Sequence, residues 1–438
     1  MSGCIRVIGL GPGDPLLRTV AAQRALDGAA RIILRTAIHP GLDDLIGDPR
    51  VASCDDLYET LSTFEDVYAA IMRRVIAAAD AEDVVYALPG SPNAGERTVR
   101  LLAERARADG VPCVVESAVG ALDVIASAVG IDLMSDGVQL IDALNLNRAF
   151  ESAPFDGGLP ELSPLRPALI TQVHSAAVAS DLKLNLARLY PEDHEVTVVR
   201  GVSAAHDDRD AIRTSPLHEI DRVGCDHLTS IWVPSLPLLE ATRSPGALLR
   251  IVAALRRPDG CAWDREQSHE SLRFELLEEA YEAAEAIDEG DPEHLAEELG
   301  DVLLEVAMHA QIAEEAGDFS IGDVYDGLVR KLIRRHPHVF GDAVAADAAD
   351  VVNTWNEVKR QERAAGGRAE PSPDSFEWLP KSMPILTRVV RSLATGEHAV
   401  TAPPGVASDL GDRLLRLIEE FSDAGADPER ELAEAYRR

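Results

Sequence analysis

Residues 274–287 read FELLEEAYEAAEAI, in which five glutamates are interspersed with apolar residues that recur at helical spacing. One apolar stripe of the expected helix consists of Phe274, Leu277, Tyr281 and Ala284. Three acidic residues fall together on the opposite side, namely Glu275, Glu279 and Glu282. Taken alone, this pattern is typical of an amphipathic helix that exposes its charged side to water.

The next segment, AEELGDVLLEVAMHAQI at 296–312, predicts a helix that is apolar on two sides. One side carries Leu299, Val302, Leu303, Val306 and Ala310, and the other carries Leu304, Met308 and Ile312. Three acidic residues lie between these sides: Glu298, Asp301 and Glu305. Such a helix is usually buried, and buried carboxylates have to be protonated, paired with cations or bound to metal. Because residues 274–329 contain no Lys or Arg, metal is the expected partner.

The spacing of the acidic residues supports this interpretation. Glu279 and Glu282 are three residues apart, so their side chains share one face of a helix. Glu298 and Asp301 repeat that spacing, and two antiparallel helices would present all four carboxylates to one centre. Oxygen ligands favour Mg²⁺ or Mn²⁺. A di-iron helical bundle would instead use Glu-x-x-His pairs, which disfavours iron here.

Basic and aromatic residues follow this acidic region. Lys331 and Arg335 are four residues apart in DGLVRKLIRRHPHVFGD, and Trp355 and Lys359 have the same spacing in NTWNEVKRQER. Carboxylate-held Mg²⁺ commonly binds polyphosphate, so we expect these residues to contact a phosphorylated ligand. The alternative is that the basic residues simply stabilise the carboxyl ends of helices.

Residues 247–363 resemble the MazG family of nucleoside triphosphate pyrophosphohydrolases. The resemblance rests on the acidic and basic segments quoted above and on CAWDREQSHESLRF, which precedes them. The family motif E-E-x-x-E…E-x-x-D corresponds to Glu278-Glu279-x-x-Glu282 and Glu298-x-x-Asp301. A departure is Ala262, where the family usually has proline. The resemblance implies an all-α, usually dimeric domain that cleaves nucleoside triphosphates to monophosphates and pyrophosphate.

The resemblance also implies roles for individual residues. Mg²⁺ would be bound by Glu279, Glu282, Glu298 and Asp301. The nucleotide would be bound by Lys331, Arg335, Trp355 and Lys359. Glu278 and Glu275 are candidates for the group that accepts the proton from water, if they are not ligands.

Residues 1–236 alternate short Val- and Ile-rich runs with amphipathic stretches, which predicts an α/β domain with a mostly parallel sheet. Six such runs stand out: CIRVIGL, ARIIL, DVVYAL, PCVVES, PALITQ and HEVTVV. The first is followed by a glycine loop, Gly9-x-Gly11-x-Gly13-Asp14, which differs from the dinucleotide-binding pattern. This loop is either a tight turn or a place where a ligand approaches the backbone closely.

The phrases VIGLGPGDP, YALPGSPNAGERTV, SAVGALDVIASAVGID and DGVQLIDAL resemble the tetrapyrrole methylase family, in the version fused to MazG in YabN-like proteins. This resemblance implies two α/β subdomains with S-adenosylmethionine between them. The loops that would bind the cofactor contain Gly9, Gly11, Gly13, Asp14, Gly90 and Ser91. Gly90-Ser91-Pro92 replaces the common Gly-Asp-Pro, so a binding or regulatory role is favoured over methyl transfer.

The sequence therefore predicts a multidomain fold, an α/β methylase-like domain at 1–236 followed by an all-α MazG-type bundle at 247–363. Linker-like compositions occur at 233–246 and 363–375. Near the carboxyl end, Asp409-Leu-Gly-Asp412 repeats the phrase Glu298-Leu-Gly-Asp301. This indicates a degenerate second helical repeat at 376–438, and the alternative is a chance similarity between two short helical phrases.

A net charge of −33 disfavours binding to nucleic acid or anionic membranes. No run approaches the roughly 18 apolar residues of a membrane helix, and the amino terminus lacks the features of a signal peptide. Five scattered cysteines without a C-x-x-C pair favour reduced thiols, and hence the cytoplasm.

The resulting hypothesis is an Mg²⁺-dependent nucleoside triphosphate pyrophosphohydrolase, a homodimer through its helical domain, that removes unwanted nucleotides from the pool. One alternative is a methyltransferase of the tetrapyrrole type, dependent on S-adenosylmethionine, whose helical domain serves dimerisation or regulation. The other is a regulator that binds nucleotide without turning it over.

Overall fold

The computed structural model describes residues 3–152, 159–201 and 211–365, together with isolated positions beyond 382. It divides into two compact units, Met1–His309 and Ala310–Arg438. Asp409 and Asp412, and with them most of the predicted repeat at 376–438, lie outside the described residues. Across the part of the chain that the structure describes, no helix combines the length and apolar character that spanning a bilayer requires.

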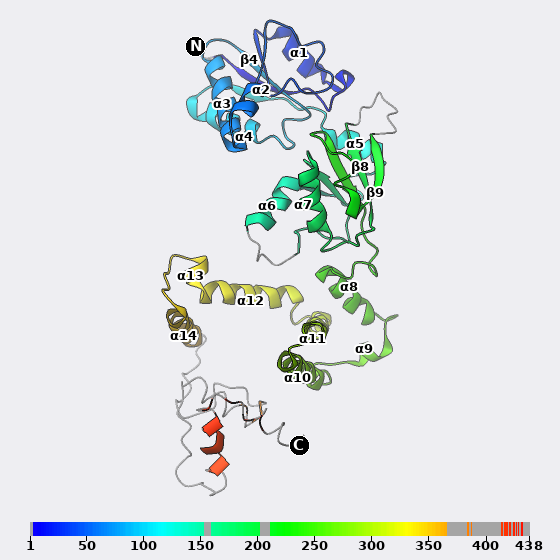
Figure 1. Cartoon of the computed structure of the whole chain (residues 1–438), viewed down its shortest axis with the longest axis vertical. Helices are drawn as coiled ribbons and strands as arrows, with labels where there is room; N and C mark the ends of the chain where they lie inside the picture. The colour runs from blue at the N-terminus through cyan, green and yellow to red at the C-terminus, as the bar shows by residue number, and fades with distance from the viewer. Residues whose placement is uncertain are drawn as a thin grey trace. The chain divides into compact units, whose positions relative to one another are not determined.

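The first unit begins with a five-stranded parallel sheet in the order β3-β2-β4-β1-β5. This part of the chain is drawn in blue to cyan in Figure 1. Its strands are β1 (Ile5–Gly9), β2 (Arg31–Leu34), β3 (Val51–Ser53), β4 (Val84–Leu88) and β5 (Cys113–Val115). Its helices are α1 (Val20–Gly28), α2 (Asp55–Thr60), α3 (Phe64–Ala79) and α4 (Arg97–Asp109). Val7 and Tyr86 enter one core, whereas Ile8 and Ala87 enter the core on the opposite face. Burial on both faces explains the continuous apolar runs of the central strands.

The second sheet has the order β6-β7-β10-β8-β9 and is mixed. Its strands are β6 (Gln139–Asp142), β7 (Ala168–Thr171), β8 (Glu195–Arg200), β9 (Ile212–Pro216) and β10 (Thr229–Val233). Its helices are α5 (Ala121–Val129), α6 (Ala143–Ser152) and α7 (Ala176–Leu186). Only the β6–β7 pair is parallel, and the other three pairs are antiparallel. The predicted mostly parallel sheet is therefore correct for the first sheet and wrong for the second.

Two glycine loops meet at the carboxyl end of the first sheet. The backbone N–H of Gly90 donates to the carbonyl of Gly11 at 2.8 Å, and the N–H of Gly11 donates back at 3.3 Å. A Cβ atom at Gly9 would come within 2.2 Å of the carbonyl oxygen of Gly90. Gly11 and Gly90 also adopt positive φ angles of 80° and 64°. Glycine is required here by close backbone approach and by left-handed conformation.

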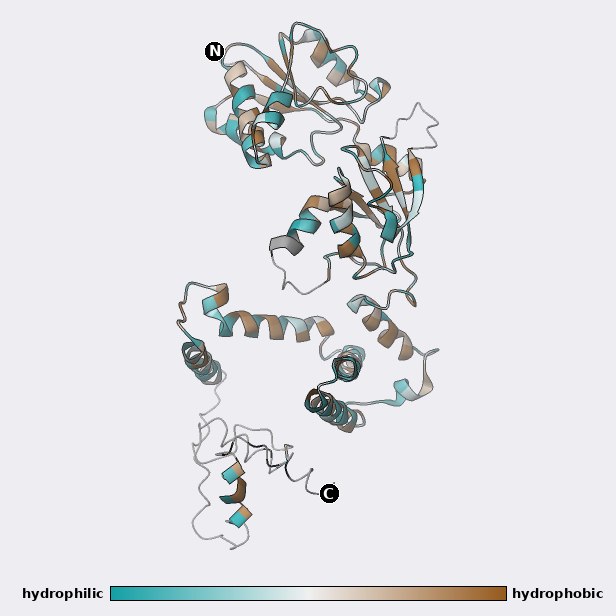
Figure 2. Ribbon diagram, in the orientation of Figure 1, coloured by the Kyte–Doolittle hydropathy of each residue, from teal (hydrophilic) through white to brown (hydrophobic). Residues whose placement is uncertain are grey.

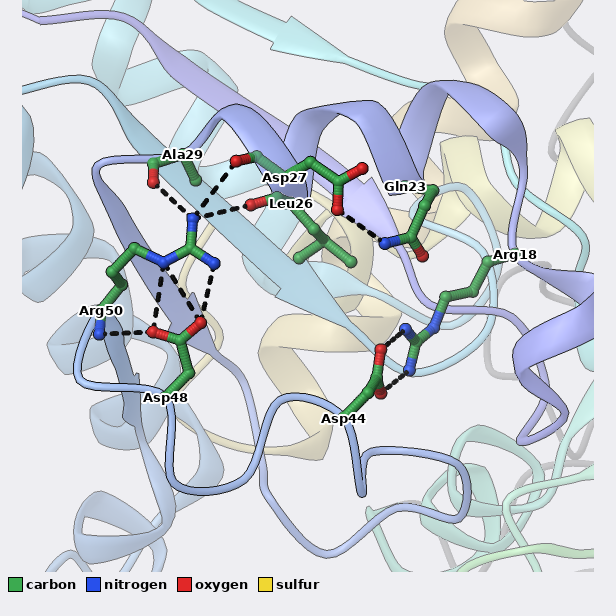
Figure 3. Close-up of polar contacts among 8 residues, drawn as sticks. All are labelled: Arg18, Gln23, Leu26, Asp27, Ala29, Asp44, Asp48 and Arg50. Carbon is green, nitrogen blue, oxygen red and sulfur yellow. Dashed lines mark hydrogen bonds and ion pairs between the residues drawn. The ribbon is translucent and has the colours of Figure 1, made fainter.

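Two arginines form hydrogen bonds and ion pairs that connect the long loop after β2 to neighbouring segments (Figure 3). Arg50 forms an ion pair with Asp48 and donates to the carbonyls of Leu26, Asp27 and Ala29 at the end of α1. These carbonyls lie at the carboxyl end of α1, so Arg50 serves as a carboxyl-terminal cap. Arg18 forms a two-pronged ion pair with Asp44. This loop is thereby held beside the Gly11–Gly13 turn.

From Pro245 to Ala316 the described chain is helical, in four elements. They are α8 (Pro245–Leu255), α9 (Ala262–Glu266), α10 (Arg273–Glu289) and α11 (Pro292–Ala316). The stretch before α8 contributes to the core of the second sheet through Leu236 and Ala241, as does Ala247 within the helix. The second unit contains α12 (Ile321–Arg335), α13 (Pro337–Phe340) and α14 (Ala348–Ala365).

Candidate active site

A short turn reverses the chain between α10 and α11. Gly290 ends α10 in the left-handed conformation, as glycine commonly does after a helix. The side chain of Asp291 then accepts hydrogen bonds from the backbone N–H groups of Glu293 and His294, which start α11. At the far end of the pair, His269 before α10 contacts His309 on α11, with 2.8 Å between their Nδ1 atoms. The two helices are therefore antiparallel neighbours.

Three predicted metal ligands converge between these helices. Glu279 and Glu282 of α10 and Glu298 of α11 offer carboxylate oxygens that all lie within 4.8 Å of one another. Glu298 is buried with 9% exposure, Glu279 is half-buried and Glu282 is exposed. Asp301 is half-buried one helical turn beyond Glu298. These four residues are called the acidic cluster below.

The pKa of Glu279 reflects its burial and the negative charges close to it. Burial raises it above the ordinary value of 4.5, and so do the charges of Asp301, Glu282, Glu298 and Glu278. Like charges at close range oppose ionisation, so the cluster stores electrostatic repulsion that a bound cation would relieve. Glu278, the proposed proton acceptor, is exposed and borders the cluster as one of these neighbours.

A histidine that the sequence did not single out joins the cluster. Nε2 of His294 lies 3.1 Å from Oε1 of Glu298, and its Nδ1 lies 3.1 Å from Oε2 of Glu289. Glu289 and Glu298 raise the pKa of His294 and favour its charged form. The four-residue spacing of His294 and Glu298 was a signal that could have revealed this contact.

A second row of titratable side chains continues along the same two helices, comprising Glu275, Glu305 and His309. Glu305 is buried with 7% exposure. Its pKa is raised by burial and by the nearby charges of Glu275 and Glu279. Burial also lowers the pKa of His309, whose ring stacks on that of His269. The sequence placed Glu305 between two apolar sides and predicted metal as the partner of such buried carboxylates, but Glu305 was not among the four predicted ligands.

The predicted nucleotide-binding residues lie on α12 and α14 in the second unit. Nζ of Lys359 lies 5.2 Å from the centre of the Trp355 ring, and the ring of His336 lies 6.1 Å from that centre. Arg335 forms a two-pronged contact with Glu362, at 2.5 Å for its shorter arm. This contact and a second one from Arg334 hold the pKa of Glu362 at about 2. Lys331 is half-buried on the same helix.

Hydrophobic and hydrophilic residues alternate along the helices of this region (Figure 2), and several of the large apolar side chains are exposed. On α10 and α11 they include Phe274, Leu277, Tyr281, Leu299 and Leu303. On α12 they include Tyr325, Leu328, Val329 and Leu332. The prediction that the 296–312 helix is buried on both sides is thus wrong for the single chain, since Leu303 is 51% exposed whereas Met308 is 3% exposed.

In the α/β domain, the predicted cofactor-binding residues cluster at the paired glycine loops. Asp14 is buried and accepts a hydrogen bond from the backbone N–H of Leu16 at 2.9 Å. Gly13 adopts a φ of 119°. Oγ of Ser91 accepts from the N–H of Asn93 at 3.4 Å. These contacts shape the loops, and their assignment to S-adenosylmethionine stays a prediction.

The α/β region and the helical region each match the model of a known protein family. Residues 5–221 match the model of the tetrapyrrole (corrin/porphyrin) methylases, and residues 267–340 match that of the MazG nucleotide pyrophosphohydrolase domain. The second match contains the whole acidic cluster.

Individual relatives agree with these matches. The protein YabN of Bacillus subtilis is 38% identical over 394 residues, which are 89% of this chain and 76% of that protein. The nucleoside triphosphate pyrophosphohydrolase/pyrophosphatase MazG of Thermotoga maritima is 41% identical over 189 residues, covering 43% of this chain and 69% of that protein. The nucleoside triphosphate pyrophosphohydrolase of Escherichia coli K12 is 40% identical over 142 residues, covering 32% of this chain and 52% of that protein.

Proposed function

Because the chain belongs to the YabN family and joins a tetrapyrrole methylase domain to a MazG domain, we propose that it hydrolyses nucleoside triphosphates to monophosphates and diphosphate with Mg²⁺. It is a hydrolase that acts on nucleoside triphosphates. The observation that carries the proposal is the convergence of Glu279, Glu282 and Glu298 within the region that matches the MazG model.

The acidic cluster fits a hard divalent cation. Its donors are carboxylate oxygens, which Mg²⁺ and Mn²⁺ prefer. The raised pKa of Glu279 reflects burial and mutual repulsion, which a cation would offset. Glu279, Glu282, Glu298 and Asp301 would therefore hold the ion. When bound, Mg²⁺ neutralises charge on the phosphates and makes a water molecule more acidic.

Other side chains of the MazG-type domain would carry the remaining steps. Glu278 is exposed at the edge of the cluster and would accept the proton of the attacking water. Trp355 would stack on the base. Lys331, Arg335 and Lys359 would bind phosphate oxygens, with Glu362 orienting the guanidinium of Arg335. These assignments rest on the matching motif and on the contacts within the second unit.

The proposal includes a homodimer through the helical domain. Phe274, Leu277, Leu299 and Leu303 are between 42% and 68% exposed, and apolar surface of this extent on neighbouring helices is typical of a protein interface.

We further propose domain bounds of 1–236, 247–363 and 376–438. Five cysteines free of disulfides support a cytoplasmic location, where nucleotide substrates occur and where the enzyme would remove unwanted nucleotides. The charge of −33 makes nucleic acid an unfavourable partner.

Methyl transfer from S-adenosylmethionine is the second candidate function. It is supported by the match of residues 5–221 to the tetrapyrrole methylases. The paired loops at Gly11 and Gly90 provide the backbone that a cofactor could approach. Ser91, in place of the common aspartate, argues for binding without transfer.

The test is a product assay with the full chain and a panel of nucleoside triphosphates, with Mg²⁺ or with EDTA. The proposal predicts diphosphate and the corresponding monophosphate, only with the metal, and strong loss in Glu279→Ala. The matched control is Glu314→Gln, at an exposed position of α11. A non-catalytic regulator would bind nucleotide without turnover. A methyltransferase would release no diphosphate but would methylate a tetrapyrrole.

A further inference from the structure

Three buried polar atoms without a hydrogen-bond partner gather beside the acidic cluster. They are Oε2 of Glu275, Oε2 of Glu305 and Nε2 of His309. The residue that matters most is Glu305, because its side chain is more than nine-tenths buried. A buried carboxylate oxygen or imidazole nitrogen without a partner costs free energy, so three of them together indicate a missing ligand.

Two of the three residues share one face of α11, and the third lies on the neighbouring helix α10. Asp301, Glu305 and His309 follow each other at four-residue intervals and share one face of α11. On α10, Glu275 lies four residues before Glu279. Glu305 feels the charges of both Glu275 and Glu279. The second row is thus displaced from the acidic cluster by about 6 Å of helical rise.

The paired histidines prepare Nε2 of His309 as an acceptor. One Nδ1 atom must donate and the other accept across the 2.8 Å contact between His269 and His309. When Nδ1–H of His309 donates, its Nε2 carries a lone pair and no proton. Metal-bound histidines characteristically use this arrangement, in which the second ring nitrogen is held by a hydrogen bond.

From this geometry we infer that Glu275, Glu305 and His309 form a second divalent-metal site, distinct from the acidic cluster. Two carboxylates and one imidazole suit a transition metal such as Mn²⁺ or Zn²⁺ better than Mg²⁺. Among the described residues, the three donors do not form a group as close as that of Glu279, Glu282 and Glu298, so side-chain rotation accompanies binding. The ion would join α10 to α11 and remove the cost of the unpartnered atoms.

The test is pulsed electron paramagnetic resonance of Mn²⁺ bound to the untagged full chain, recorded in an excess of Mg²⁺. Mg²⁺ competes for oxygen-only positions, whereas a site with an imidazole ligand retains Mn²⁺. We expect modulation from a directly bound nitrogen in the wild type. His309→Gln should abolish it, and Glu305→Gln should weaken the affinity for that Mn²⁺ by about tenfold or more.

His294 supplies the decisive control, because it is the histidine that contacts Glu298 in the acidic cluster. His294→Gln should retain the nitrogen signal, and so should Glu282→Gln. The inference is overturned if no nitrogen signal is seen, or if the signal survives in His309→Gln and disappears in His294→Gln. Thermal melting of each metal-free variant checks that it folds. Since the signal does not depend on turnover, this result and that of the product assay are independent.

Discussion

Glu279 on α10 and Glu298 on α11 bring carboxylate oxygens within 4.8 Å of each other across the turn at Gly290. Two negative groups this close repel, and burial together with this repulsion raises the pKa of Glu279. Apolar residues of both helices, including Met308 and Ala283, are buried, and their burial offsets this repulsion. Without a cation the pair destabilises this region.

Mg²⁺ should therefore stabilise the protein. The pKa of Glu279 is higher in the folded than in the unfolded state, so without metal this group lowers stability increasingly as the pH rises above 4.5. A free Mg²⁺ concentration of about 100 times the dissociation constant should raise the free energy of unfolding by about 2.7 kcal/mol. Thermal melts at neutral pH with Mg²⁺ or EDTA measure this stabilisation. The shift should shrink in Glu279→Gln and persist in Glu314→Gln, and an equal shift in both would contradict the prediction.

Glu278→Gln should lower kcat by about 100-fold or more, because a proton acceptor contributes that much to hydrolysis. Its affinity for Mg²⁺ should change little, since Glu278 borders the acidic cluster without belonging to the close group of three. Steady-state rates and calorimetric Mg²⁺ titration separate the two effects. Glu297→Gln, at an exposed position beside Glu298, is the control. If Glu278→Gln instead loses Mg²⁺ affinity, the residue is a ligand.

Trp355→Ala should raise KM by about tenfold or more, because stacking on a base contributes roughly 1–3 kcal/mol. Trp355 is 38% exposed, and Nζ of Lys359 lies 5.2 Å from the centre of its ring. Trp355→Phe keeps an aromatic face and should restore most of the affinity. Steady-state assays provide KM for both variants. Unchanged KM in the alanine variant would remove Trp355 from the nucleotide site.

Leu303→Asp should convert the homodimer to a monomer. Leu303 is 51% exposed in the single chain, and an interface would bury it in apolar surroundings where a carboxylate is costly. Light scattering coupled to size exclusion gives the mass. Glu314→Lys changes the charge at an exposed position of the same helix and should leave the dimer intact. A wild-type monomer, or a dimeric Leu303→Asp variant, would refute the proposed interface.

The Arg335–Glu362 contact makes α12 and α14 sensitive to acid. Because the pKa of Glu362 falls from 4.5 to about 2 on folding, its stabilising effect is complete above the unfolded value and is lost as the pH falls through that range. Hydrogen exchange of the α14 amides, corrected for intrinsic exchange rates, should show that protection in the wild type declines as the pH falls. Glu362→Gln should lose less protection over the same range. Parallel curves for the two proteins would contradict this.

The sequence predicted the elements that local spacing determines. The helical period of the apolar residues and the three-residue spacing of the acidic residues were enough to make two assignments. They placed Glu279 and Glu282 on one helix, and Glu298 and Asp301 on the next. The six predicted strands form as well. Strand direction in the second sheet was beyond this reasoning, because apolar runs carry no information on whether neighbours are parallel. β3, β6, β9 and β10 were also missed.

Other features depend on tertiary register or on a partner. The contact between His269 and His309 joins residues 40 positions apart, and no local pattern marks it. The exposed side of α11, with Leu303, looked like core because apolar periodicity is the same for a core and for a subunit interface. His294 was overlooked although its spacing from Glu298 was available.

Anomalous diffraction from crystals soaked with Mn²⁺ and a non-hydrolysable nucleoside triphosphate tests the central claim most directly. We expect a Mn²⁺ peak among the carboxylates of Glu279, Glu282 and Glu298, in contact with the phosphates. Nucleotide bound in the crystal with no ion among those three carboxylates would contradict it.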